Sequence, residues 1–130
     1  MNEKGMSIML SVLVIMSVSL LIALSIGILG SAELEVASSS VLSENAFHIA
    51  ALCAEEAATK LRANSSYTGE SITFSEGSCT ITVTGAGTKT IDSVGVLGDF
   101  TRKVRVIGTI AANSQGNAKK FSITSWEEIP

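Results

Sequence analysis

The chain begins with a long run of apolar positions that no charged residue interrupts. Between Lys4 and Glu33 there is no Asp, Glu, Lys, Arg or His, and Met6 to Ala32 make up 27 such residues. As an α-helix this segment would be about 40 Å long, which exceeds the roughly 30 Å hydrocarbon core of a bilayer. The pattern therefore predicts a transmembrane helix over residues 6–32.

A secretory signal peptide is the alternative interpretation of the same segment. The apolar core of a signal peptide is only about 7 to 15 residues long, so this run is too long, although Gly30-Ser31-Ala32 offers small residues to a signal peptidase. Cleavage after Ala32 stays open as the lesser alternative. Lys4 before the run, and Glu33 and Glu35 after it, favour an N-terminus inside and a domain outside.

Residues 33–63 contain no Pro and no Gly and are rich in Ala, Leu and Glu, which predicts that the helix continues as an amphipathic one. The polar run that starts at Asn64 and reaches Gly69 is expected to end it. One face of this helix repeats small and apolar positions at helical spacing, and it consists of Ala46, Ala50, Cys53, Ala54, Ala57 and Leu61. Such small side chains would let a sheet approach closely.

A second apolar line runs along the same predicted helix. It consists of Leu34, Val41, Ile49 and Leu52. The domain cannot easily cover this line and the first face at once, so the line either contacts another partner or forms the rim of the domain's own core.

After Gly69 the period of the pattern changes from near 3.6 to 2, which predicts half-buried strands. Strands are expected around residues 71–75, 79–84, 90–96, 104–110 and 119–126. Turn residues separate them at 76–78, 85–88 and 98–99, and residues 113–117 form the last loop. Short loops between successive strands predict an antiparallel meander. The expected fold class is α+β, with one domain at 33–130 whose sheet of four or five strands covers 70–127.

Charge is low and thinly spread. The net charge is −3 and the mean hydropathy of +0.44 comes largely from the first thirty residues. No specific nucleic-acid binding is predicted, because the nine Lys and Arg form only one cluster, Arg102, Lys103 and Arg105. That cluster falls in a strand, where an outward cationic edge that deters edge-to-edge pairing is favoured over a ligand site.

No constellation of residues points to catalysis. His48 has no Ser, Cys or Asp near it in a recognisable motif, and Glu55 and Glu56 are adjacent on a helix, so their side chains diverge by about 100°. Gly85-Ala86-Gly87 precedes a strand, whereas a phosphate-binding loop opens a helix. We therefore predict no catalytic residue, no metal, no cofactor and no enzymatic activity.

Two cysteines, Cys53 and Cys79, lie 26 positions apart, without a CxxC motif and with only His48 to complete a metal site. Cys53 lies on the face expected to meet the sheet, and Cys79 shares a strand face with Ile81 and Val83. In an oxidising compartment a disulfide between them would contribute roughly 3.5 kcal/mol in the chain-entropy model. Two separate buried thiols are the alternative.

A short basic leader ending in Gly, an uncharged helix that continues as an amphipathic one, and a C-terminal antiparallel sheet together resemble the type IV pilin and pseudopilin family. The motif resemblance covers Lys4 to about Ala37, and the architectural resemblance covers the whole chain. Lys4-Gly5 followed by Met6 resembles the prepilin peptidase site. The run AFHIAALCAEEAATKL also resembles the AFxAAEAA-type segment of minor pilins.

The resemblance implies that prepilin peptidase removes residues 1–5 on the cytoplasmic side and leaves Met6 as a new, usually methylated, N-terminus. It implies a single-pass protein of the inner or cytoplasmic membrane, which contacts lipid before an assembly platform moves it into an extracellular filament. Other pilin-like subunits would then contact its N-terminal helix. Pilins that form the bulk of a filament carry a Glu at the fifth mature position, where this chain has Leu10, so it resembles minor or tip-type subunits.

Two other functions compete with this expectation. One is an unprocessed single-pass membrane protein whose outer domain binds a ligand or partner. The other is a secreted binding domain cleaved after Ala32.

Overall fold

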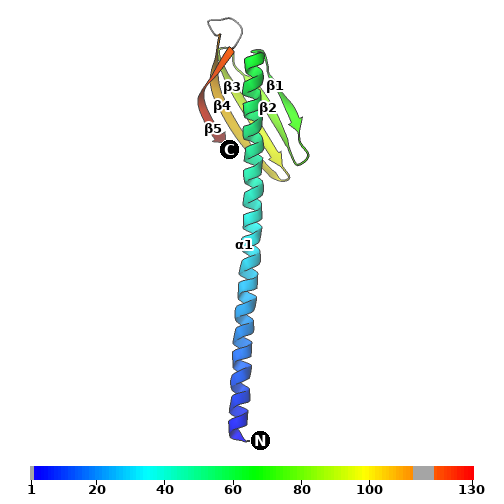
Figure 1. The fold of residues 1–130 in the computed structure, drawn as a ribbon, viewed down its shortest axis with the longest axis vertical. Coiled ribbons are helices and arrows are strands. Elements are labelled where there is room, and N and C mark those ends of the chain that lie inside the picture. Colours follow the sequence, from blue (N-terminus) through cyan, green and yellow to red (C-terminus); the bar gives the residue numbers. More distant parts are fainter. Residues whose placement is uncertain (1, 113–118) are drawn as a thin grey trace. The chain divides into compact units, whose positions relative to one another are not determined.

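The computed structural model describes residues 2–112 and 119–130 (Figure 1). Its elements are helix α1 (Glu3–Ala63) and strands β1 (Gly69–Thr73), β2 (Ser78–Thr84), β3 (Thr88–Leu97), β4 (Phe100–Ala112) and β5 (Lys119–Ile129). Residues up to 39 and residues 40–130 form two units, and each is described by itself. The predicted α+β class, a long N-terminal helix with an antiparallel sheet, is confirmed.

The helix ends where the sequence predicts. The Asn64 amide donates to the Lys60 carbonyl at 2.7 Å, and the Asn64 side-chain oxygen then accepts from the Ser66 amide at 3.0 Å. An Asx turn of this kind satisfies backbone groups that a helix end leaves free. The predicted loop at 113–117 lies outside the described residues.

The five strands form one sheet in the order β1-β2-β3-β4-β5, with every neighbouring pair antiparallel, so the predicted meander is confirmed. Several strand boundaries differ from expectation, and β1, β3 and β4 begin two to four residues earlier than the pattern predicts. β5 continues past Trp126 to Ile129, and β1 stops at Thr73 because the Phe74 amide donates to the Gly77 carbonyl at 2.7 Å and begins the turn. Phe74 is therefore a partly exposed turn residue rather than a strand residue.

The C-terminal part of α1 covers one face of the sheet (Figure 1). The helix face predicted from small-residue spacing, from Ala46 to Leu61, is buried in full. The core residues that the sheet contributes alternate along β2, β3 and β4, and they include Cys79, Ile81, Val83, Ile91, Val104 and Val106. Strand alternation thus sends one set of side chains toward the helix and leaves the other set on the outer face.

Contact between α1 and β3 is closest at Gly95. A Cβ atom added there would lie 2.4 Å from the Ala46 carbonyl oxygen and 2.6 Å from the Ala50 amide nitrogen. Ser93, two residues earlier on the same strand face, is fully buried and its hydroxyl has no hydrogen-bond partner among the described residues. Small side chains on both elements let the helix backbone rest almost directly on the sheet, as the sequence predicts.

Cys53 of α1 and Cys79 of β2 form a disulfide, with their Cα atoms 6.5 Å apart. Both residues are buried, and both belong to the core cluster. The bond therefore fastens the helix to the sheet within the core, and the structure contains the predicted pair rather than two separate thiols.

The expectation of a cationic edge at residues 102–105 is wrong. β4 lies between β3 and β5, so it has no free edge. Arg105 donates two hydrogen bonds to the Asp92 carboxylate, at 2.7 and 3.0 Å. Arg102 forms an ion pair with Glu128 of β5, and its hydrogen bond lowers the pKa of the Glu128 carboxyl. In the five-stranded sheet the cluster of Arg102, Lys103 and Arg105 lies on an internal strand, which the sequence pattern did not indicate.

Replacing Gly95 with Ala tests the close contact between helix and sheet. We expect Gly95→Ala to lower the free energy of unfolding by about 1 to 3 kcal/mol, because backbone atoms must shift to admit the methyl group. Gly87→Ala is the matched control, since an added Cβ there meets nothing within 4 Å. Urea unfolding of the full chain in detergent micelles, followed by fluorescence of Trp126, measures both. Equal stability of the two variants would contradict the contact.

The disulfide is tested on the exported protein. Non-reducing mass analysis should show two hydrogens fewer than the reduced chain, and reduction should lower the free energy of unfolding by roughly 3.5 kcal/mol. Detection of two free thiols, at Cys53 and Cys79, would show that the bond does not form in the native compartment.

Candidate membrane segment and processing site

The apolar segment 6–32 lies within α1, and its large apolar side chains are all exposed in the isolated chain. Leu10 is 61% exposed and Leu21 is 64% exposed. Among the described residues, α1 is the one helix that is long and apolar enough to cross a membrane. An all-round apolar helix surface requires an apolar environment, so this segment is a candidate membrane anchor.

Four of the six serine hydroxyls in this segment donate hydrogen bonds to the helix itself. Those of Ser11 and Ser25 donate to the carbonyl oxygens of Ser7 and Leu21, four residues earlier, at 2.9 and 2.8 Å. Those of Ser17 and Ser31 donate in the same way to carbonyls three residues earlier, at 2.9 Å. A polar group with an internal partner adds little cost in hydrocarbon. Serine inside an apolar helix is the sequence signal for this feature.

The candidate processing residues Lys4, Gly5 and Met6 lie in the first turns of α1. The amides of Gly5 and Met6 donate to the Asn2 carbonyl at 2.9 and 3.3 Å. Apart from its chain neighbours and the adjacent helix backbone, no described atom lies within 4 Å of a Cβ built on Gly5. The Gly5-Met6 peptide bond is thus uncovered in a terminal turn, where helices fray most easily.

Leu10 follows on the same helix, where it lines a hollow of about 240 Å³ together with Glu3, Met6 and Ser7. Glu3 is therefore the carboxylate near this position, and it belongs to the candidate leader. If residues 1–5 were removed, the segment 6–32 would contain no carboxylate to accompany a new amine at Met6.

The residues in the second apolar line of the helix have different surroundings. Ile49 packs against the core, next to Gly77, as the rim interpretation expects. Leu52 and Val41 remain exposed, at 57% and 59%, as does Leu34 in the N-terminal unit. Ile49 therefore fits the rim interpretation, and the other three residues face away from the domain's own core. Their contact with another partner stays a prediction.

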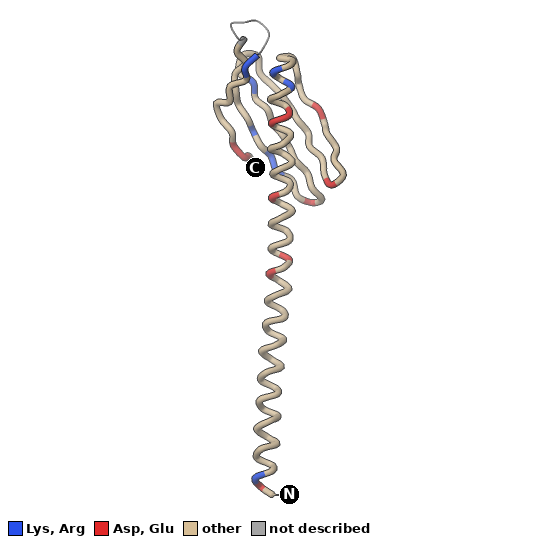
Figure 2. The backbone as a smooth tube through the Cα atoms, viewed as in Figure 1, with Lys and Arg blue, Asp and Glu red and all other residues tan. Residues whose placement is uncertain are grey.

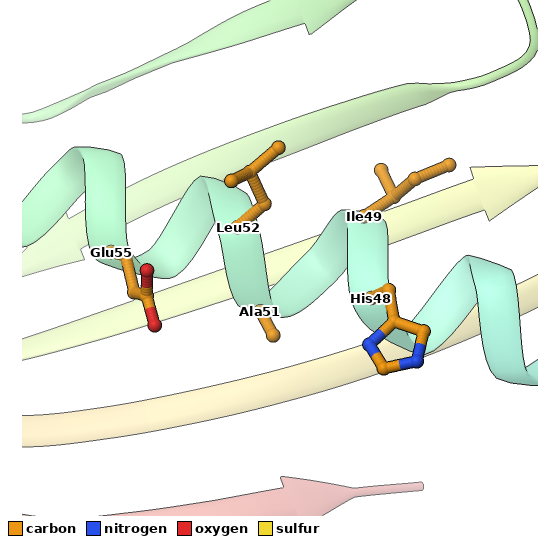
Figure 3. Close-up of a pocket in the computed structure, with 5 residues that line it drawn as sticks. All are labelled: His48, Ile49, Ala51, Leu52 and Glu55. Carbon is orange, nitrogen blue, oxygen red and sulfur yellow. The ribbon is translucent and has the colours of Figure 1, made fainter.

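Residues considered for catalysis lie along the exposed side of α1. His48, Ile49, Ala51, Leu52 and Glu55 line an open hollow of about 400 Å³, in which their side chains diverge around a single helix (Figure 3). His48 lies 3.7 Å from the Glu44 carboxylate, and Lys60 lies 3.8 Å from that of Glu56. Among the described residues, no group of three His, Cys, Asp or Glu side chains is placed to hold a metal ion.

Comparisons with models of known protein families, with curated proteins and with solved structures found no match for this chain. The functional assignment accordingly rests on the residues and the geometry described above.

The membrane segment is tested by placing charge at its centre. Two arginines, Leu21→Arg with Leu24→Arg, should together cost about 5 to 7 kcal/mol of insertion free energy and remove the chain from the membrane fraction. The matched control, Val41→Arg with Leu52→Arg, adds the same charge to exposed helix positions outside the segment and should remain inserted. Alkaline carbonate extraction measures both, and retention of the first variant at the level of the second would contradict the assignment.

Proposed function

We propose that this chain is a structural subunit, of the minor pilin or pseudopilin type, in a type IV pilus-like filament or a type II secretion-like pseudopilus. The observation that carries the proposal is the junction at Gly5, where a short basic leader meets a long uncharged helix whose side chains are exposed. This junction resembles a prepilin peptidase site. Its exposed terminal turn is suited to removal of residues 1–5.

An all-round apolar helix has to be covered by something other than its own domain. Lipid covers it while the chain is anchored in the membrane, and the helices of neighbouring subunits would cover it once a filament forms. Both environments are apolar, so transfer between them keeps the same surface buried. The internally bonded serines suit both environments, because they require no outside partner.

The residue at position 10 supports a minor role. A new amine at Met6 would be charged, and burial of an unpaired charge in an apolar assembly is costly. Leucine at this position supplies no carboxylate to a neighbour. A subunit that occurs once or a few times in a filament, or at its tip, would bury few such unpaired charges. A bulk subunit would bury one at every position along the filament.

In this proposal the protein's partners are prepilin peptidase, the assembly platform, membrane lipid and other pilin-like subunits. The chain is a building element of a machine and not an enzyme. Its domain would face the outside, fastened by the Cys53-Cys79 disulfide, which persists in oxidising compartments.

An unprocessed membrane-anchored binding protein is the second candidate. It is favoured by an exposed apolar patch on β5, where Ile123 is 52% exposed and Trp126 is 40% exposed. Exposed aromatic and aliphatic side chains of this kind are typical of contact surfaces. The patch suits a subunit contact equally well, so processing decides between the two candidates.

Cleavage at Gly5 provides that test. Incubation of the membrane-embedded chain with a prepilin peptidase should remove residues 1–5 and leave Met6 as the N-terminus, as read by intact mass. Gly5→Ala should abolish the cleavage, because a side chain then occupies the residue before the scissile bond. Gly27→Ala is the matched control, since neither glycine contacts other described atoms and only Gly5 adjoins the bond.

An unchanged mass of the natural chain, with residues 1–5 retained, would overturn the pilin-like assignment and favour the anchored binding protein. A mature N-terminus at Glu33 would instead establish a secreted domain.

A further inference from the structure

The turn that joins α1 to β1 contains the tripeptide Asn64-Ser65-Ser66. An asparagine followed two positions later by serine or threonine, with any residue except proline between them, is the acceptor motif for N-linked glycans. The other asparagines are followed at that position by Lys4, Phe47, Gln115 and Lys119. Asn64 is therefore the one asparagine of the sequence that has this motif.

The surroundings of the motif decide whether it can be modified, because three residues often match by chance. Asn64 and Ser66 are both exposed. No charged residue lies in the turn between the end of α1 and the start of β1, as Figure 2 shows. The Tyr67 amide donates to the Asn64 carbonyl at 3.1 Å, so the backbone reverses direction within four residues. An enzyme can therefore reach the motif at the surface while the helix and the sheet stay folded.

The side chain of Asn64 is held in a defined orientation. Its oxygen Oδ1 accepts a hydrogen bond from the Ser66 amide at 3.0 Å, which closes the Asx turn. Its nitrogen Nδ2 donates to no partner in the part of the chain that the structure describes. The turn thus fixes the oxygen and leaves the nitrogen, the atom that carries an N-linked glycan, open to solvent.

Ending the helix accounts for Asn64 but not for a hydroxyl at position 66. The Asx turn uses the backbone amide of residue 66, which every residue except proline provides. The residue that ties the turn to the sheet is instead Ser65, whose hydroxyl accepts from Lys119 of β5 at 2.9 Å. Contact with the domain therefore falls on the middle position, where the motif tolerates almost any side chain, and the two recognised positions remain exposed.

We propose that Asn64 is an N-glycosylation site, to which an oligosaccharyltransferase transfers a glycan from a lipid diphosphate-linked oligosaccharide. Nδ2 attacks the anomeric carbon of the first sugar, and the new bond between nitrogen and carbon replaces the bond between that carbon and the diphosphate oxygen. One proton leaves Nδ2 for a base of the transferase, and the lipid diphosphate is the leaving group. The transfer changes no oxidation state.

This inference goes beyond the proposed function, because the pilin-like subunit and the anchored binding protein both place residues 33–130 outside the membrane. Lys4 before the apolar segment, and Glu33 and Glu35 after it, favour that orientation. A glycan is bulky and solubilising, so it would keep other proteins from close contact with the turn after α1.

Mass spectrometry of the chain isolated from its native membranes tests the site. After reduction of the disulfide, trypsin cuts behind Arg62 and Lys89, so one peptide of residues 63–89 contains the motif. We expect this peptide to carry the added mass of an oligosaccharide, and its fragments should place that mass on Asn64. A peptide 63–89 of unmodified mass would overturn the proposal.

Four variants separate the glycan site from the turn. Ser66→Ala keeps the backbone amide that closes the turn, and Asn64→Asp keeps an oxygen acceptor, so both should fold and lose the glycan. Ser66→Thr and Ser65→Ala are the matched controls, because both preserve the motif and should keep the glycan. Trp126 fluorescence measures folding in each variant. Equal glycan occupancy in Ser66→Ala and Ser66→Thr would contradict the assignment.

The intact mass of the same samples reports the removal of residues 1–5 separately. A processed chain with an unmodified Asn64 refutes the glycan site and leaves the proposed function standing. A glycosylated chain that retains residues 1–5 supports the site and overturns the pilin-like assignment.

Discussion

The close contact between α1 and β3 is the constraint on which the domain depends. At Gly95 there is no room for even a methyl group between the strand and the helix backbone at Ala46 and Ala50. Dispersion attraction falls off steeply with distance. The separation between α1 and β3 at Gly95 therefore sets how well the other side chains between the helix and the sheet pack. The buried Ser93 hydroxyl lacks a hydrogen-bond partner among the described residues, which costs folding free energy. The small size of the serine side chain offsets this cost, because it lets the helix approach the sheet.

Around this contact, a disulfide and a hydrogen bond fix the helix to the strands on either side of β3. The disulfide joins α1 to β2 in the core. At the opposite flank, Arg102 of β4 donates to the Ser43 hydroxyl of α1 at 2.6 Å and also pairs with Glu128 of β5. A small domain with a single covering helix has a limited core, and links of this kind stabilise it beyond what apolar burial supplies. They also keep the sheet's orientation on the helix fixed.

The N-terminal segment obeys a different constraint, because none of its large apolar side chains is buried among the described residues. Its surface is apolar all round, and Ser17 and Ser31 are among the serines that donate to carbonyl oxygens of the same helix, so it is suited to an apolar environment. The pilin-like proposal concerns what provides that environment.

Much of this protein was predictable from local pattern. Local features of the sequence predict the uncharged run to Ala32, the helix end at Asn64, the buried helix face and the meander. These features are the spacing of apolar residues, the residues that end a helix and the short loops, and each acts over neighbouring residues. The pairing of the two cysteines was predictable because they lie on the faces of the helix and the strand that were expected to meet. Likewise, the candidate processing site rests on three adjacent residues, Lys4, Gly5 and Met6, and on the absence of a carboxylate at Leu10, so folding adds little to it.

Only the tertiary structure decided which residues from distant parts of the sequence meet. From the sequence, Arg102 and Arg105 were expected at an exposed sheet edge, because their partners Glu128 and Asp92 lie on other strands. The periodicity of a single strand does not reveal the order of strands in the sheet. The role of Gly95 was equally hidden, because its neighbours are helix backbone atoms. Sequence by itself determined the elements and the candidate membrane segment, and packing determined the contacts, because local propensities act within an element whereas ion pairs and close approaches act between elements.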